Sequence, residues 1–154
     1  MKILDVLKKE SIISDLKAMD KRGVLEEMVR DVASKSEGLD KERLLEVILE
    51  REKLGSTGIG YGVAIPHGKL KSLSHLVVTF GRSVTGIDYQ SLDNKPAHLF
   101  FLILAPEDST AAHLKILARI SKLLKDPSFR KKLLTASSSD DIFTAIAEEE
   151  GKLN

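Results

Sequence analysis

Apolar residues recur three and four positions apart in two stretches near the start of the chain, which predicts two amphipathic helices. Asp20 precedes the first stretch and Asp40 the second, and aspartate is a preferred N-cap because its carboxylate accepts a hydrogen bond from a free backbone amide. Gly38 follows the first helix, and Arg51 stands near the end of the second. The apolar stripes consist of Val24, Leu25, Met28, Val29 and Val32, and of Leu44, Leu45, Ile48 and Leu49.

A third long helix is predicted after Asp108 or Ser109, and the dipeptide Asp126-Pro127 ends it. One face of this helix carries His113, Ile116, Leu117, Ile120 and Leu124. Two short helices complete the chain, at 128–134 and 140–149.

Apolar runs of three to six residues, interrupted only by Thr79, predict buried strands at 63–65, 76–80 and 99–104. The segment 83–96 is rich in turn residues and leaves room for a short edge strand near Ile87. No linker and no internal repeat separates these elements. The pattern predicts a single α/β domain over residues 1–154, with helices covering a small sheet.

Composition excludes several classes of function. The net charge of +1 signals no binding to nucleic acid or to a membrane surface. The absence of cysteine removes disulfides, thiolate nucleophiles and cysteine-ligated metals, and it fits a cytoplasmic protein. No apolar run is long enough to span a bilayer, and the N-terminus lacks the apolar region of a signal peptide.

The segment 51–69 is the most informative part of the sequence. Four glycines fall between Gly55 and Gly62, and an apolar run then leads to Pro66-His67-Gly68. Glycine lets the backbone approach a ligand closely, and we expect Gly68 to free a turn after the histidine. The pattern therefore places a titratable imidazole at the end of a strand, beside backbone that can bind an anion.

Three known site types fit this segment poorly. A dinucleotide fingerprint follows a strand and opens a helix, whereas these glycines follow a helix and lead into a strand. A phosphate loop between Gly62 and Gly68 has five intervening residues where four are required, and Leu70 replaces the magnesium-binding hydroxyl. A zinc site made from His67 and His113 lacks an evident third ligand.

The histidines and Arg51 each allow a structural and a functional interpretation. His75 and His98 are most simply polar residues at strand ends, and His113 on its apolar face is either a core residue or a functional one. Arg51 is either a solvated helix end or a phosphate clamp ahead of the glycine loop.

The residues from Arg51 to Gly68 resemble the active-site signature of enzyme IIA of the bacterial phosphoenolpyruvate-dependent phosphotransferase system, in its fructose/mannitol class. The match continues through Gly86-Ile87-Asp88, Leu102–Glu107 and His113-Leu114. Within the class, the chain is most similar to the nitrogen-related regulatory enzyme IIA. The resemblance implies an α/β fold with a mixed, largely five-stranded sheet between helices.

The resemblance also implies a role for each site residue, and no metal or cofactor. His67 is the phosphorylated histidine, His113 its companion, and Arg51 stabilises the phosphoryl group. The residues expected to bind the phosphoryl group around the glycine loop are Ser56, Thr57 and Gly58. The sequence departs from the family at Tyr61, where asparagine or an acidic residue is common, so Tyr61 receives no role.

The implied donor is a phosphorylated histidine carrier protein (HPr or its nitrogen-related paralogue). Sugar-type members pass the group to an enzyme IIB domain, whereas nitrogen-related members bind regulatory target proteins. The sequence leaves both alternatives open, and it indicates neither a nucleic-acid partner nor membrane insertion. Ile59, Tyr61 and Leu70 are candidates for the rim of the partner surface, with inward packing as the alternative.

Overall fold

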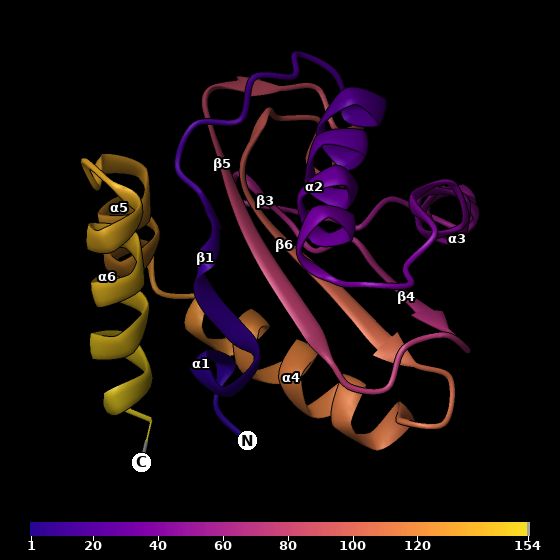
Figure 1. The fold of residues 1–154 in the computed structure, drawn as a ribbon. Coiled ribbons are helices and arrows are strands. Elements are labelled where there is room, and N and C mark those ends of the chain that lie inside the picture. Colours follow the sequence, from indigo (N-terminus) through magenta and orange to yellow (C-terminus); the bar gives the residue numbers. More distant parts are fainter. Residues whose placement is uncertain (154) are drawn as a thin grey trace.

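Helices cover both faces of a mixed β-sheet in the computed structural model, which describes residues 1–153 (Figure 1). The strands are β1 (Leu7–Ile13), β2 (Gly58–Gly60), β3 (Val63–Ala64), β4 (His67–Leu70), β5 (Val77–Ile87) and β6 (Ala97–Pro106). The helices are α1 (Ile3–Val6), α2 (Lys21–Lys35), α3 (Lys41–Lys53), α4 (Thr110–Leu123), α5 (Pro127–Thr135) and α6 (Ser139–Gly151).

The sheet is built around β5 and β6, which pair in antiparallel fashion. The strand order is β1-β5-β6-β3-β2, and β4 pairs with β6 as well. β3 and β4 both run parallel to β6, β3 opposite Leu99 and Phe100 and β4 opposite 103–106. They therefore follow one another along the same edge of β6, and only Ile65 and Pro66 separate them.

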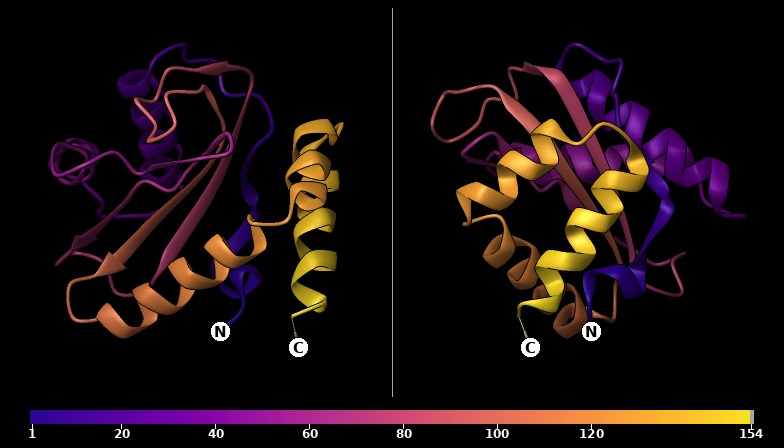
Figure 2. Two further views of the ribbon diagram at one scale, coloured as in Figure 1. Left: turned by 180° about the vertical axis from the view of Figure 1, so that it is seen from behind. Right: turned by 90° about the vertical axis from the view of Figure 1, so that its left-hand side faces the viewer.

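Two apolar cores lie on the two faces of the sheet, and successive residues of β6 point into them alternately. Phe100 and Leu102 pack in the core beneath α2 and α3, whereas Phe101 and Ile103 pack in the core beneath α1, α4, α5 and α6. Figures 1 and 2 show the two helical layers on opposite sides of the sheet. Burial on both faces explains why β6 is apolar without interruption from Leu99 onward rather than alternating.

The predicted helices are confirmed, and so are most of their caps. The side chain of Asp20 accepts a hydrogen bond from the Gly23 amide at 2.7 Å, and Asp40 caps α3 in the same way. Ser109 precedes α4 but makes no capping hydrogen bond through its side chain. The mixed α/β sheet between helices that the sequence predicted is also confirmed.

The strands differ more from expectation. Among residues 1–153 the sheet has six strands, where the family resemblance implied largely five, and the apolar pattern did not predict β1, β2 and β4. β5 continues to Ile87 as one strand, although its register against β6 shifts between Arg82 and Ile87, which pairs with Ala97. His67 begins a strand instead of ending one, so the prediction that Gly68 frees a turn was wrong.

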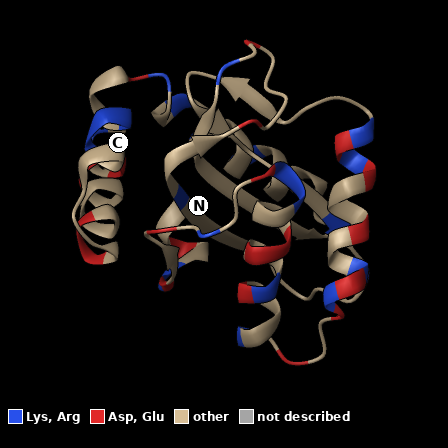
Figure 3. Cartoon of the chain, turned by 90° about the horizontal axis from the view of Figure 1, so that it is seen from above, with Lys and Arg blue, Asp and Glu red and all other residues tan. Residues whose placement is uncertain are grey.

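Charged side chains of both signs are interspersed along the helices, whereas the central strands carry almost none (Figure 3). Across the described chain, no helix combines the length and the apolar character that crossing a membrane requires.

Candidate functional site

A pocket of about 350 Å³ lies where α3, β4 and α4 meet. It contains all three residues that the sequence singled out as catalytic candidates, namely Arg51, His67 and His113. The residues that line it are Val47, Arg51, His67, Gly68, Lys69, Thr110, His113, Leu114 and Leu117.

Ile65 and Pro66, which separate β3 from β4, fix the imidazole of His67. Pro66 has no N–H to donate, and its carbonyl accepts from the Ile103 amide of β6 at 3.0 Å. Nδ1 of His67 lies 2.8 Å from the carbonyl oxygen of Ile65. A carbonyl can only accept, so Nδ1 carries the proton and Nε2 keeps its lone pair. The local fold thereby selects the tautomer in which Nε2 is the nucleophilic nitrogen.

Gly68 allows α3 to pack directly on β4. A Cβ atom at this position would lie 2.7 Å from Cγ1 of Val47, which is too close for two carbon atoms. The glycine is thus required for the close approach of a helix that carries Arg51, and not for a turn.

His113 faces His67 from the first turn of α4. Its side chain is only 5% exposed, and the two ring centroids lie 5.2 Å apart with an interplanar angle of 70°. Nε2 of His113 is buried and has no hydrogen-bond partner within residues 1–153. An unpartnered buried nitrogen is costly, so a ligand that accepts or donates a hydrogen bond is favoured here.

Both imidazoles are held neutral near pH 7. Burial lowers the pKa of His67, and the Arg51 guanidinium lowers it further, against the opposing effects of the Ile65 carbonyl and of Glu52. Burial, followed by the charges of His67 and Lys69, lowers the pKa of His113 to about 4. A neutral imidazole is the form that attacks phosphorus.

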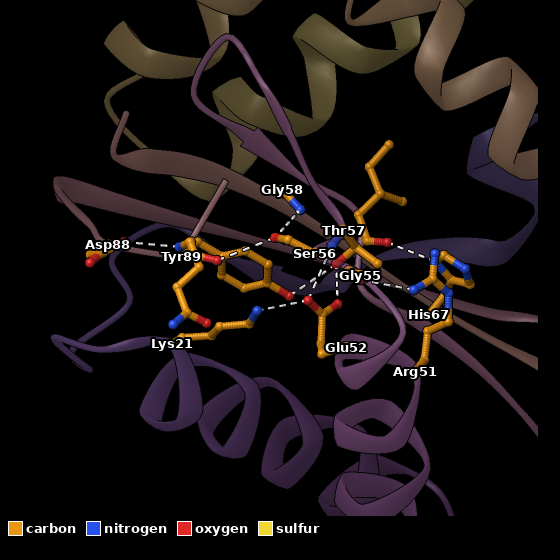
Figure 4. Close-up of polar contacts among 12 residues, drawn as sticks. Lys21, Arg51, Glu52, Gly55, Ser56, Thr57, Gly58, His67, Asp88 and Tyr89 are labelled. Carbon is orange, nitrogen blue, oxygen red and sulfur yellow. Dashed lines mark hydrogen bonds and ion pairs between the residues drawn. The ribbon is translucent and has the colours of Figure 1, made fainter. Parts of the chain in front are cut away.

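Two cationic side chains border the pocket. Nη1 of Arg51 donates to the carbonyl oxygen of Gly55 at 2.9 Å, which orients the guanidinium at the end of α3 (Figure 4). Nζ of Lys69 donates to the Thr110 hydroxyl at 2.8 Å. The pocket therefore combines a nucleophile, a second imidazole and two positive charges.

Ser56, Thr57 and Gly58 lie next to this pocket without lining it. The Thr57 amide donates to Oε1 of Glu52 at 3.1 Å, and the Gly58 amide donates to the Ser56 hydroxyl at 3.0 Å. These two donors are already occupied in this conformation. Their direct contact with a phosphoryl group stays a prediction.

Reasoning from the sequence missed Thr110 and considered Lys69 only as a charge that affects association with the carrier, not as a residue of the pocket. Residues two apart on a strand share a face, so Lys69 follows from His67 once β4 is known to be a strand. No feature of the sequence marks Thr110 beyond its place at the start of α4.

The remaining site predictions had mixed outcomes. Nδ1 of His98 lies 3.0 Å from the Ser83 carbonyl, which agrees with a structural role. Of the proposed rim residues, Leu70 is buried at 5% and cannot form a rim. Ile59 and Tyr61 are 40% and 74% exposed, but they line a different hollow, and the Arg130 guanidinium of α5 lies over the Tyr61 ring, so their place at the rim stays a prediction. No cluster of three or more metal-ligating side chains occurs within the described part of the chain.

Comparison with known proteins gives consistent matches over nearly the whole chain. Residues 5–149 match the family model of the phosphoenolpyruvate-dependent sugar phosphotransferase system, EIIA 2. A nitrogen regulatory protein of Bradyrhizobium diazoefficiens is 43% identical over 96% of this chain and 95% of its own length. The fructose-specific EIIABC component of Bacillus subtilis is 42% identical over 97% of this chain, which corresponds to 24% of that longer protein.

Solved structures share the fold. The crystal structure of nitrogen regulatory protein IIA-Ntr from Neisseria meningitidis superposes with a TM-score of 0.88 at 32% identity, covering 94% of this chain and 98% of the other. The enzyme IIA in a mannitol IIA–phosphorylated IIB complex from Escherichia coli gives 0.77 at 22% identity, covering 93% of this chain and 99% of that one.

Proposed function

We propose that this chain, which belongs to the EIIA 2 family of the phosphoenolpyruvate-dependent sugar phosphotransferase system, carries its phosphoryl group on Nε2 of His67. Members of the family are phosphotransferase components that work through a phosphohistidine, so the chain is a phosphocarrier of this system or of its nitrogen-related branch. One observation carries the assignment. Donation by Nδ1 of His67 to the Ile65 carbonyl leaves Nε2 as the free nucleophile in the pocket.

In the proposed reaction, the lone pair of Nε2 attacks the phosphorus of a phosphohistidine on the carrier protein. A new N–P bond forms on His67 as the N–P bond to the carrier breaks, and that electron pair returns to the carrier's imidazole. The Nδ1 proton stays in its hydrogen bond to Ile65 throughout, so the ring does not rotate.

The neighbouring groups match the charge of the transferred phosphoryl group. Its three equatorial oxygens share negative charge in the transition state, and catalysis consists mainly of positioning and electrostatic stabilisation. Arg51 and Lys69 supply positive charge beside His67, and neutral His113 supplies an imidazole N–H. Ser56, Thr57 and Gly58 shape the loop that orients Arg51.

The proposed donor is a phosphorylated histidine carrier protein, HPr or its nitrogen-related paralogue. The onward partner is an enzyme IIB domain, as in the mannitol complex, or a regulatory target protein. Identities of 43% to a nitrogen regulatory protein and 42% to a fructose-specific component do not separate these branches. Phosphorylation adds strong negative charge to the pocket mouth, and this change can favour or block a partner.

Phosphorylation by a purified, phosphorylated carrier protein tests the assignment. The wild type is expected to gain an acid-labile, base-stable phosphate, and His67→Ala is expected to lose it completely. His75→Ala serves as the control, because His75 is exposed and lies outside the pocket. A label that persists in His67→Ala, at any other residue, would refute the assignment.

A second measurement decides whether the protein passes its phosphate to an enzyme IIB domain or acts on a regulatory target. Incubation of the phosphorylated protein with sugar-type enzyme IIB domains separates onward transfer from retention of the phosphate. Capture experiments with the phosphorylated and unphosphorylated forms then show whether a regulatory target depends on the phosphate.

A further inference from the structure

Glu52 presents a buried carboxylate directly behind the candidate site. Its side chain is 5% exposed, and both of its oxygens are hydrogen-bonded (Figure 4). Oε1 accepts from the Thr57 amide at 3.1 Å and from Nζ of Lys21 at 2.9 Å, and Oε2 accepts from the Thr57 hydroxyl. Burying a carboxylate is favourable only with such partners, so its position is tightly determined.

Two further side chains complete this buried network. The phenol oxygen of Tyr89 lies 3.1 Å from the Thr57 hydroxyl, and Tyr89 is fully buried. Nζ of Lys21 lies 4.6 Å from the centre of the Tyr89 ring. The network therefore joins the start of α2, the end of α3 and the segment after β5.

The network reaches the candidate site through a short turn. Glu52 and Arg51 are neighbours in the last turn of α3, and Thr57 follows the turn that contains Gly55. The Gly55 carbonyl accepts the hydrogen bond that orients the Arg51 guanidinium. The Glu52 side chain holds Thr57, which lies two residues after Gly55, and the Gly55 carbonyl faces Arg51; Figure 4 draws the Glu52–Thr57 and Arg51–Gly55 contacts as dashed lines.

We infer that Glu52 is a positioning residue for phosphoryl transfer, which acts through Thr57 and the Gly55 carbonyl on Arg51. The inference rests on the proposed function of His67. Glu52 does not line the pocket, so its effect on the reaction is indirect. A misplacement of a charged group by about 1 Å can slow a reaction about 100-fold, which gives such a positioning residue a measurable effect.

A double-mutant cycle between Glu52 and Arg51 tests the inference. The rate of phosphoryl transfer from saturating phosphorylated carrier is measured in wild type, Glu52→Gln, Arg51→Ala and the double variant. Glu52→Gln is expected to slow transfer about 10- to 100-fold when Arg51 is present. In the Arg51→Ala background the same change should alter the rate by less than about twofold, because the group that it positions is gone. Equal factors in both backgrounds would overturn the inference.

Matched variants keep a folding defect from imitating the result. Glu50→Gln changes the same residue type on the same helix at an exposed position, and it is expected to transfer at the wild-type rate. If Glu52→Gln does not fold, Thr57→Val takes its place in the cycle, because it replaces the hydroxyl with a methyl group of similar size and leaves the backbone amide in place. Thr57→Ser should recover most of the rate that Thr57→Val loses, and failure of this rescue would count against the inference.

An observation on the side chain itself completes the experiment. The Nε–H resonance of Arg51 in labelled protein is expected to broaden or shift in Glu52→Gln and to stay unchanged in Glu50→Gln. If the wild type accepts phosphate on His67 but the cycle is additive, only the positioning role fails. If the wild type accepts no phosphate on His67, the proposed function fails, and the positioning role of Glu52 fails with it.

Discussion

At the scale of single residues, the two imidazoles of the pocket differ in what holds them. His67 is fixed by a hydrogen bond from Nδ1 to the backbone, which exposes the lone pair of Nε2 to the pocket. His113 is fixed by burial on α4, and its Nε2 lacks a partner within the described residues. This difference suits one ring to nucleophilic attack and the other to contact with the transferred group.

Removal of the side chain of Arg51 or of His113 should slow phosphoryl transfer, while His67 remains the residue that accepts the phosphate. In Arg51→Ala and in His113→Ala we expect a loss of about 2–4 kcal/mol of transition-state stabilisation, or about 30- to 1000-fold in rate. Rapid-quench measurement of phosphoryl transfer checks this, with His75→Ala as the control. Near wild-type rates in both variants would mean that other groups stabilise the phosphoryl oxygens.

Titration of His113 should make the protein less stable in acid. Its pKa is lowered to about 4 in the folded state, below the ordinary value of 6.5, so the unfolded chain binds the proton more tightly. The corresponding stability is fully present above about pH 6.5 and is lost as the pH falls towards 4. At pH 4.5 the loss attributable to this group is about 2 kcal/mol.

Urea unfolding at pH 7 and pH 4.5 measures this effect. The fall in the free energy of unfolding is expected to be about 2 kcal/mol smaller in His113→Leu than in wild type. His75→Ala should keep the wild-type fall. Identical falls in wild type and His113→Leu would contradict the assignment of the low pKa.

At the scale of elements, the helices could be predicted because their signals are local. An aspartate cap and an apolar stripe lie within one segment, as for Asp20 and α2. β1 and β4 could not be predicted in this way, because they are partly polar and pair with strands distant in sequence, and β2 is only three residues long and pairs with the neighbouring β3. β4 acquires its form from β6, more than thirty residues later.

The same distinction applies to the candidate site. His67 and Arg51 stand out in the sequence through their glycine and helix-end surroundings. The network of Lys21, Glu52 and Tyr89 carries no such mark, because each residue is ordinary in its own segment and only the fold brings the three together.

The contact between α3 and β4 gives a prediction at this scale. In Gly68→Ala the new Cβ atom meets Cγ1 of Val47 at 2.7 Å, so the Val47 side chain or α3 itself must shift away from β4. Overpacking of this kind costs about 1–3 kcal/mol, and it should also separate Arg51 from His67 and slow phosphoryl transfer.

A compensating variant separates this cause from others. Val47→Ala removes the clashing methyl group, so the double variant should recover part of both the stability and the transfer rate of Gly68→Ala. Thermal unfolding and transfer kinetics check this recovery. If the double variant is no better than Gly68→Ala alone, the helix–strand contact is not the reason for the glycine.

At the scale of the whole molecule, the site depends on both helical layers. Arg51 comes from α3, which covers one face of the sheet, and His113 comes from α4, which belongs to the layer on the other face. They meet at β4, which extends the sheet beside β6. Figure 1 shows β4 and α3 on the opposite side of the molecule from α5 and α6, so a partner can approach His67 without contact with the C-terminal helices.

This placement predicts where a carrier protein binds. Amide chemical shifts of labelled protein titrated with the carrier should change mainly between residues 55 and 72 and at the start of α4. Leu114, which lines the pocket and is 59% exposed, belongs to the apolar part of this surface. Shift changes centred elsewhere would refute the placement.

Charge at the pocket mouth should govern how fast the carrier arrives. Lys71 is exposed and follows β4, so Lys71→Glu is expected to lower the association rate constant and leave the dissociation rate nearly unchanged, since rim charges act mainly on encounter. Lys132→Glu reverses an exposed charge on α5, on the far side of the molecule, and provides the control. Stopped-flow association at low salt should show the decrease for Lys71→Glu alone, and high salt should abolish it, because exposed charges are screened within about 10 Å at 0.1 M ionic strength. A decrease of equal size in both variants would mean that net charge, and not this surface, steers the carrier.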